Sequence, residues 1–202
     1  MKRPSQKTVL IMTVLATGAA GLLLKMNYAD PEHPKMNRHP IKLYEITATT
    51  DAPGPWDSVS AYIGYDVVTP SCSPENKLLG VHELPTDLGR TIVMTRVGTK
   101  TWKGNFYRDL VLDENYYQLG ICHWDATSVV ANFVVHNEMF AAGGVMEEFL
   151  KNGTTATYFK TIDFTDRSRT AGALESLSTD PEVVQSPNAF FPITVNVTEV
   201  TP

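Results

Sequence analysis

The sequence has little cysteine, with only Cys72 and Cys122 among its 202 residues. Neither lies in a Cys-x-x-Cys motif or a histidine-rich stretch, so the pair makes a poor metal site and we expect no metal. We expect a disulfide between them instead, with two free thiols as the alternative. Closing a loop of about fifty residues should stabilise the fold by about 4 kcal/mol in the chain-entropy model.

Motifs of catalysis and cofactor binding are also missing. The chain has no Gly-x-Ser-x-Gly, no His-Glu-x-x-His, no P-loop and no dinucleotide-binding fingerprint. Asp163 and Asp166 lack the later Gly and Glu of an EF-hand calcium loop. The sequence therefore predicts no cofactor and carries no signature of an enzyme.

Neither sign of charge is in large excess, since the net charge is −5 and the isoelectric point is near 5.5. A mildly acidic chain argues against nucleic acid and against an anionic membrane surface as partners. The hydrophobic fraction of 43% is enough for a core, and the length fits one domain with appendages. Because β-prone runs recur between 13 prolines and 13 glycines, we expect an all-β domain.

The N-terminus has the composition of an export segment. Lys2, Arg3 and Lys7 precede residues 9–24, which hold no charge. A basic start followed by an apolar run is typical of bacterial secretory segments. We therefore predict that residues 1–25 are a signal peptide or a signal anchor. A buried core helix is a further alternative.

Two outcomes remain open for this segment. We expect residues 8–24 to stay in the inner membrane as an anchor, with the rest of the chain in the periplasm. The alternative is cleavage at the small residues 18–20, which would leave a soluble periplasmic protein. No cysteine follows the apolar run, which excludes a lipoprotein anchor. Residues 26–40 hold three prolines and read as an extended linker, in which His33 and His39 are solvated.

Residues 41–202 read as a β-sandwich domain, with a small β-barrel as the alternative. The clearest pattern covers residues 58–69, where alternate apolar residues from Val59 to Val67 share one face. The expected strands are 41–50, 58–69, 91–96, 101–112, 116–124, 128–136, 154–164 and 189–200.

Residues 106–124 are predicted to form a central hairpin. Two β-prone runs flank the polar residues Asp113, Glu114 and Asn115, which are suited to a tight loop. A three-residue loop pairs Leu112 with Tyr116, but one more residue would move every partner to the other face, so the register stays open.

Little helix is expected in the domain. Residues 145–151 have apolar residues at helical spacing, and Asn152-Gly153 is a good helix stop. Residues 78–89 read as a loop. Residues 165–187 read as a polar surface excursion, with one further short helix possible at 171–177.

The candidate site lies around the second cysteine. His123 and Asp125 share one face of a strand, and with Ser128 nearby they suggest a hydrolytic group. A catalytic triad, however, needs a base oriented by a buried carboxylate and aimed at a separate nucleophile, which neighbours at a strand end rarely achieve. We instead interpret Trp124 as packing near the disulfide, with His123 and Asp125 on the rim.

Aromatic and acidic residues nearby suggest a surface for partner contact, because Trp and Tyr are frequent in interface hot spots. Asp113 and Glu114 could also serve as an acid/base pair, although a solvated turn is the simpler interpretation. The candidate partner-binding residues are Trp102, Asp113, Glu114, Tyr116, Tyr117, His123, Trp124 and Asp125.

Together with the N-terminus and the linker, two stretches give the chain a family resemblance: Asp-Ala-Pro-Gly-Pro at 51–55 and Gly-Ile-Cys-His-Trp at 120–124. The layout resembles small exported β-rich proteins of proteobacteria, several of which are similar to periplasmic immunity proteins of secreted antibacterial toxins. The chain lacks the lipobox cysteine of the lipoprotein members, so the resemblance does not define how it is anchored. It implies a protein partner and no catalytic residues.

Three functions follow as hypotheses. The first is a non-catalytic periplasmic binding protein, most concretely an immunity protein that occludes a toxin's active site. The second is an envelope hydrolase with a pocket near His123 and Asp125. The third is a structural or adhesive envelope protein that pairs with another chain through an exposed edge strand.

Overall fold

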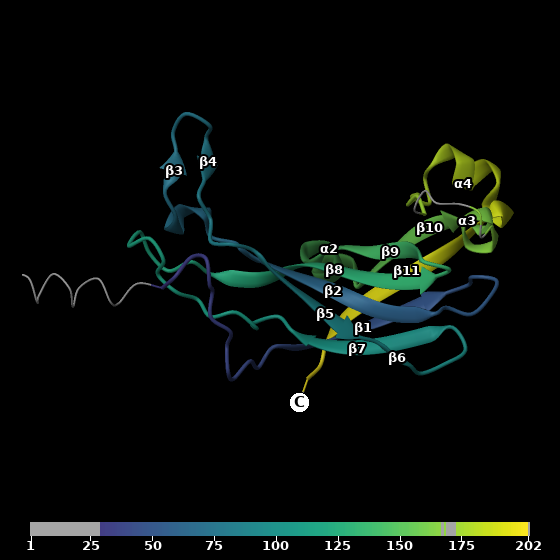
Figure 1. Cartoon of the computed structure of the whole chain (residues 1–202), viewed down its shortest axis with the longest axis horizontal. Coiled ribbons are helices and arrows are strands. Elements are labelled where there is room, and N and C mark those ends of the chain that lie inside the picture. The colour runs from purple at the N-terminus through teal and green to yellow at the C-terminus, as the bar shows by residue number, and fades with distance from the viewer. Residues whose placement is uncertain (1–28, 167, 169–172, 202) are drawn as a thin grey trace, which may run out of the picture.

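The computed structural model describes residues 29–166, 168 and 173–201 (Figure 1). The predicted export segment, residues 1–25, lies outside this range. In the part of the chain that is described, no helix has the length and apolar character needed to cross a membrane.

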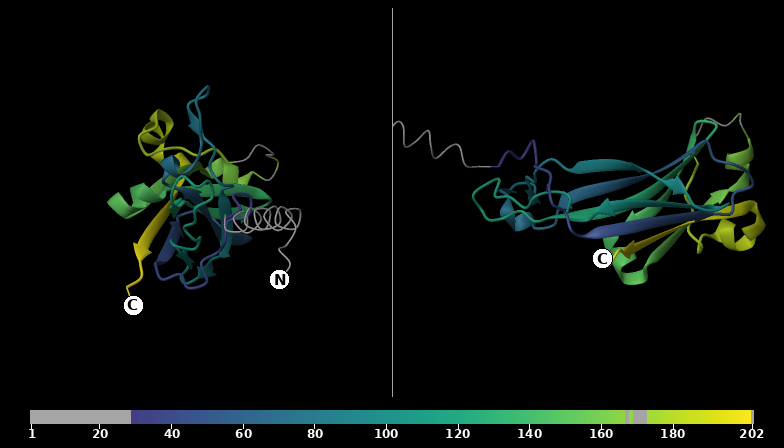
Figure 2. Two further views of the ribbon diagram at one scale, coloured as in Figure 1. Left: turned by 90° about the vertical axis from the view of Figure 1, so that its left-hand side faces the viewer. Right: turned by 90° about the horizontal axis from the view of Figure 1, so that it is seen from below.

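The domain consists mostly of antiparallel β-strands arranged in two larger sheets, as predicted (Figures 1 and 2). One sheet has the order β10 (Thr154–Lys160), β11 (Phe190–Glu199), β1 (Leu43–Thr50), β7 (Thr101–Tyr107) and β6 (Thr95–Arg96). The other has the order β5 (Leu88–Val93), β2 (Ser58–Val67), β8 (Trp124–Val135) and β9 (Glu138–Val145). Among the described residues the two sheets share no strand and do not close into a barrel.

The core lies between the two sheets. Trp102 of β7 packs edge-on against Phe133 of β8 with ring centroids 5.3 Å apart, and Phe159 of β10 meets Phe140 of β9 at the same separation. These contacts join one sheet to the other, so the arrangement is that of a sandwich.

Period-two patterns position the best predicted strands. In β2 the inward residues Ala61, Ile63, Tyr65 and Val67 are buried, and β1 alternates between buried and half-buried along its whole length. One β-bulge interrupts the pairing of β2 with β8, because Gly64 pairs with Ser128 but Tyr65 pairs with Ala126. This bulge leaves Thr127 outside the regular ladder.

The predicted central hairpin is wrong. β7 ends at Tyr107 and pairs with β1 and β6, whereas β8 begins at Trp124 and pairs with β2 and β9. The segment between β7 and β8 is irregular because part of its backbone forms hydrogen bonds with residues 35–37. Leu110 accepts a hydrogen bond from the Asn37 N–H, and Leu112 donates one to Lys35.

The described part of the predicted linker contacts the same segment. Residues 29–40 lie along the 108–114 segment, where Met36 forms a β-bridge with Val111 and the Lys35 ammonium lies 2.7 Å from a Glu114 carboxylate oxygen. Ala29 is buried.

One edge strand, β9, was not predicted. His136 and Asn137 both have positive φ, at 52° and 66°, and form the tight two-residue turn that brings β9 back along β8. Gly143 and Gly144 lie in this strand, directly before the helix predicted at 145–151.

Helices are short and more numerous than the single one expected. The predicted helix is confirmed as α2 (Met146–Asn152), ended by Gly153 in the left-handed conformation. The expected strand at 154–164 gives way to α3 (Thr161–Thr165) after β10. The possible helix at 171–177 is not formed by its described residues, since Ser176 pairs with Tyr158, and a helix follows instead as α4 (Pro181–Gln185). Single 3₁₀ turns occur at η2 (Pro70–Cys72) and η3 (Pro187–Ala189).

Candidate functional site

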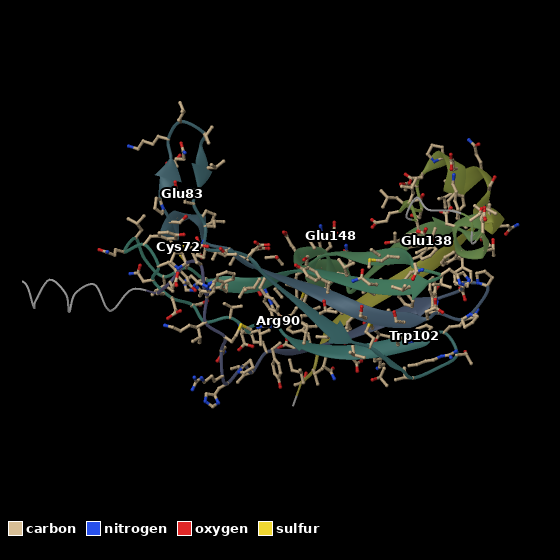
Figure 3. All side chains as sticks on the ribbon, in the orientation of Figure 1. Cys72, Glu83, Arg90, Trp102, Glu138 and Glu148 are labelled. Carbon is tan, nitrogen blue, oxygen red and sulfur yellow. A yellow bond between two sulfur atoms is a disulfide. The ribbon has the colours of Figure 1, made fainter. Side chains whose placement is uncertain are left out.

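The predicted disulfide between Cys72 and Cys122 is present, with Cα atoms 5.2 Å apart. Cys72 lies in η2, just after β2, and Cys122 precedes β8, so the bond joins the ends of two neighbouring strands. Both residues are buried. The bond marks one end of the sandwich, where Cys72 is labelled in Figure 3.

Trp124 is fixed beside the disulfide by two partners. Its indole N–H donates to the Tyr116 hydroxyl at 3.1 Å, and its backbone N–H donates to Asp113 at 2.8 Å. Trp124 and Tyr116 are both buried, and burial raises the pKa of the Tyr116 phenol. The structural role predicted for Trp124 is consistent with this geometry.

His123 and Asp125 have separate partners. The His123 imidazole lies 2.7 Å from the other oxygen of Asp113, and this pair is exposed. Asp125 instead accepts two hydrogen bonds from the Arg108 guanidinium, at 2.6 and 2.5 Å, and this pairing raises the pKa of Arg108. Within the described residues no hydroxyl or thiol contacts His123, so the geometry of a triad is not formed.

The second predicted pair, Asp113 and Glu114, is also divided. Asp113 holds the start of β8, while Glu114 pairs with Lys35 and forms a β-bridge with Cys122. The two carboxylates therefore serve different structural contacts.

A cavity of about 410 Å³ lies next to Asp125, between Arg108 and α2. Its lining includes Asp125 but not His123. The hydrolase hypothesis needs His123 and Asp125 in one pocket, and only Asp125 lines this cavity.

Trp102 is separate from the other candidates. It lies near the opposite end of the sandwich from Cys72 (Figure 3), where it is buried against Phe133. Tyr117 does belong to the disulfide end. Its pKa is raised by burial and by the nearby carboxylates of Glu83 and Glu32.

Sequence reasoning missed a small projecting hairpin at this end (Figure 1). It consists of β3 (Glu75–Asn76) and β4 (Val81–His82), of which β4 lies in the stretch 78–89 predicted to be a loop. Its two arms are joined at the base because the Glu83 N–H donates to Pro74 O and the His82 ring lies 3.1 Å from Ser73 O. The disulfide at Cys72 lies directly before this base.

The tip of the hairpin is a defined turn. The Asn76 side chain accepts hydrogen bonds from the backbone N–H groups of Leu78 and Leu79, at 3.1 and 3.2 Å. Gly80 closes the turn with a φ of 66°, which a residue with a side chain rarely adopts. The signal that could have revealed this turn is the spacing of Asn76 and Gly80, two turn-forming residues four positions apart.

The turn presents apolar side chains to solvent. Leu78, Leu79 and Val81 are 92%, 68% and 53% exposed. The carboxylates of Glu75 and Glu83 flank them on the same hairpin and are exposed as well.

No metal site is formed in the described ranges, where no three side chains of His, Cys, Asp or Glu come together. Comparisons with protein-family models, with curated proteins and with solved structures found no match to the chain. The function is therefore inferred from the side chains of this protein and their contacts.

Proposed function

We propose that the protein is an exported, non-catalytic binding protein whose disulfide end docks on a protein partner. In its most concrete form it is a periplasmic immunity protein that neutralises a secreted antibacterial toxin by covering its active site. The observation that carries this proposal is the apolar tip of the β3–β4 hairpin, exposed at Leu78, Leu79 and Val81.

The tip has the properties of a docking element. The three side chains are each more than half exposed, and exposed apolar groups of this kind mark interaction sites. Asn76 and Gly80 hold the turn in one conformation, so little ordering is needed when a partner binds. A narrow projection of this shape fits a cleft better than a flat surface.

Charge favours a basic protein as the occupant. Glu75 and Glu83 flank the tip and outnumber the exposed Lys77 beside them, and Glu32 lies near Tyr117 at its base. These carboxylates complement a cleft with a basic rim, which is the kind of cleft an enzyme uses to hold an anionic substrate. They oppose an anionic lipid surface.

The disulfide and the apolar N-terminal segment support an oxidising, exported location. Such a location is where a toxin delivered into the periplasm would be met. The divided partners of His123 and Asp125 support binding over hydrolysis.

The test is binding to the toxin encoded by the neighbouring gene. Burying one leucine is worth about 1.5–3 kcal/mol, so replacing Leu78 and Leu79 by Asp should weaken binding at least about 100-fold and abolish protection of cells. Leu174 and Leu177, exposed by 75% and 63%, provide the matched control as Leu174→Asp with Leu177→Asp. Calorimetry and a growth assay read out both variants.

Three outcomes overturn the proposal. One is that no neighbouring gene encodes a toxin and no toxin is bound. Another is equal weakening by both double variants. The last is that Leu78→Asp with Leu79→Asp abolishes binding to anionic lipid vesicles while toxin binding is unchanged, which would assign the tip to a membrane.

A further inference from the structure

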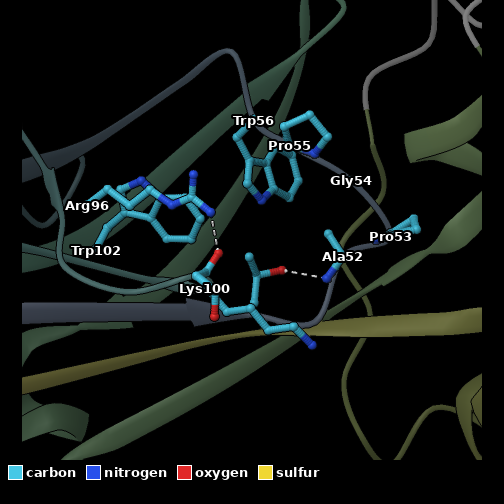
Figure 4. A pocket seen from close by; sticks show the side chains of 10 residues that line it. Ala52, Pro53, Gly54, Pro55, Trp56, Arg96, Lys100 and Trp102 are labelled. Atoms are coloured by element: carbon cyan, nitrogen blue, oxygen red, sulfur yellow. Dashed lines mark hydrogen bonds between the residues drawn. The ribbon is translucent and has the colours of Figure 1, made fainter.

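The end of the sandwich that carries Trp102 holds a cavity of about 290 Å³ (Figure 4). It lies between the β1–β2 loop and the β6–β7 turn. Its lining includes Thr50, Trp56, Arg96, Lys100 and Trp102.

Two tryptophans give the cavity rigid aromatic walls. Trp56 packs edge-on against Phe133, Phe140 and Phe164, with ring centroids 5.1, 5.2 and 4.8 Å away. The chain before it is constrained by Pro53 and Pro55, whose rings fix φ. The site is therefore formed before any ligand arrives.

The second wall is Trp102, which the Arg96 guanidinium covers at 5.5 Å from the ring centroid. Arg96 is held in place because it donates to Gly98 O at 2.9 Å and to Thr99 O at 2.6 Å. Within the described residues it has no carboxylate partner. Its positive charge is thus fixed at the mouth of the cavity and not neutralised there.

Donors without acceptors line the floor. The Trp56 indole N–H is buried and has no hydrogen-bond partner among the described residues. Figure 4 shows the ring edge of Trp56 turned toward the space above Lys100. Thr50 is buried, with an exposed fraction of 5%. Its hydroxyl oxygen accepts a hydrogen bond from the Ala52 N–H at 3.2 Å. No described acceptor takes the hydroxyl hydrogen of Thr50.

We propose that this cavity binds an acidic sugar ring, a hexuronate or a similar carboxylate-bearing pyranose. The apolar face of the ring packs on Trp56, since Arg96 covers the ring of Trp102, and the carboxylate pairs with Arg96 at the mouth. Lys100, whose ammonium lies 2.7 Å from the exposed Asp51, assists. Ring hydroxyl oxygens accept from Trp56 and Thr50. The cavity volume suits a single ring.

The floor distinguishes this ligand from others of similar size. An aromatic acid offers a carboxylate and a flat face, but it has no ring oxygens for the Trp56 and Thr50 donors. A neutral sugar supplies those oxygens but leaves the Arg96 charge unpaired. This inference stands apart from the proposed docking function, which uses the hairpin at the other end of the molecule (Figure 3).

The buried indole N–H gives a direct readout. The full chain, purified with its disulfide intact and labelled with ¹⁵N-tryptophan, has three tryptophans, and single Trp→Phe variants assign their indole resonances. Glucuronate, glucose and benzoate are each titrated to about 50 mM, since a single ring is expected to bind with millimolar affinity. We expect glucuronate to move the Trp56 resonance saturably and to leave Trp124 unmoved.

Glucose and benzoate should each bind at least about tenfold more weakly than glucuronate, because each lacks one set of partners. Arg96→Gln should weaken glucuronate by a similar factor. Lys103→Gln is the matched control, since the Lys103 ammonium pairs with Glu45 outside the cavity lining. The proposal is overturned if the Trp56 resonance does not move, if benzoate binds as well as glucuronate, or if the two variants have equal effects.

Discussion

Tyr65 shows how one buried group can set the alkaline limit of the fold. Its ring is 1% exposed, its hydroxyl donates to Tyr107 O at 2.8 Å, and burial raises its pKa. A folded-state pKa above the unfolded value means that the neutral phenol is favoured by folding. The stabilisation is complete below the unfolded pKa of about 10 and is lost as the pH rises toward the folded value.

We therefore expect the free energy of unfolding to fall above about pH 10, and Tyr65→Phe to fall less steeply there. At pH 7 the variant should be less stable by about 1 kcal/mol, because one hydrogen bond is lost. Urea unfolding between pH 7 and 11.5 measures both effects. Tyr62→Phe is the control, since Tyr62 is 39% exposed. Identical pH profiles for Tyr65→Phe and the natural protein would show that another group limits stability.

At the scale of elements, strand β9 depends on a close approach of two backbones. A Cβ on Gly143 would lie against the carbonyl oxygen of Val129 in β8, well inside van der Waals contact, and backbone cannot move aside. A Cβ on Gly144 would meet the flexible carboxylate of Glu148 at 2.9 Å and make an ordinary contact with Thr155 Cγ2 at 3.6 Å. We expect Gly143→Ala to lower the free energy of unfolding by about 2–3 kcal/mol and Gly144→Ala by less than about 1 kcal/mol. Denaturant midpoints measure both, and equal values would contradict the proposed backbone contact.

These elements also show what the sequence could and could not predict. Strands β2 and β11 were predictable because their alternation matches a buried face, and α2 because Gly153 ends it. β9 was not, because Ala and Gly have low β-propensity and its pairing is decided by β8. The hairpin at 106–124 was wrongly predicted because β-propensity does not reveal that residues 35–37 form backbone hydrogen bonds with residues 110–112.

The candidate site divides in the same way. The disulfide could be predicted because the chain has only two cysteines, and the packing of Trp124 near it because Cys122 lies two positions before Trp124. The division of His123 and Asp125 depends on Asp113 and Arg108, which reach them only once the loop is folded. The unpaired indole N–H of Trp56 is a property of packing, and the sequence indicated only a turn at that position.

At the scale of the whole molecule, the disulfide encloses parts of both sheets. The loop between Cys72 and Cys122 spans 50 residues and contains β5 of one sheet and β6 and β7 of the other. Reduction therefore increases the conformational entropy of the unfolded chain over a large part of the domain. The contacts of both sheets in the folded state stay intact. The chain-entropy model gives a loss of about 4 kcal/mol for a loop of this length.

We expect Cys72→Ser with Cys122→Ser to lower the free energy of unfolding by about that amount and to increase the urea m-value, because the unfolded chain expands. The natural protein measured in reducing agent is the control and should match the variant. If the bond braced only the β3–β4 hairpin, the loss would stay below about 1 kcal/mol, the scale of a local contact, and the m-value would not change. A full loss would mean that a reducing compartment removes a large share of the stability typical of a domain, about 5–15 kcal/mol.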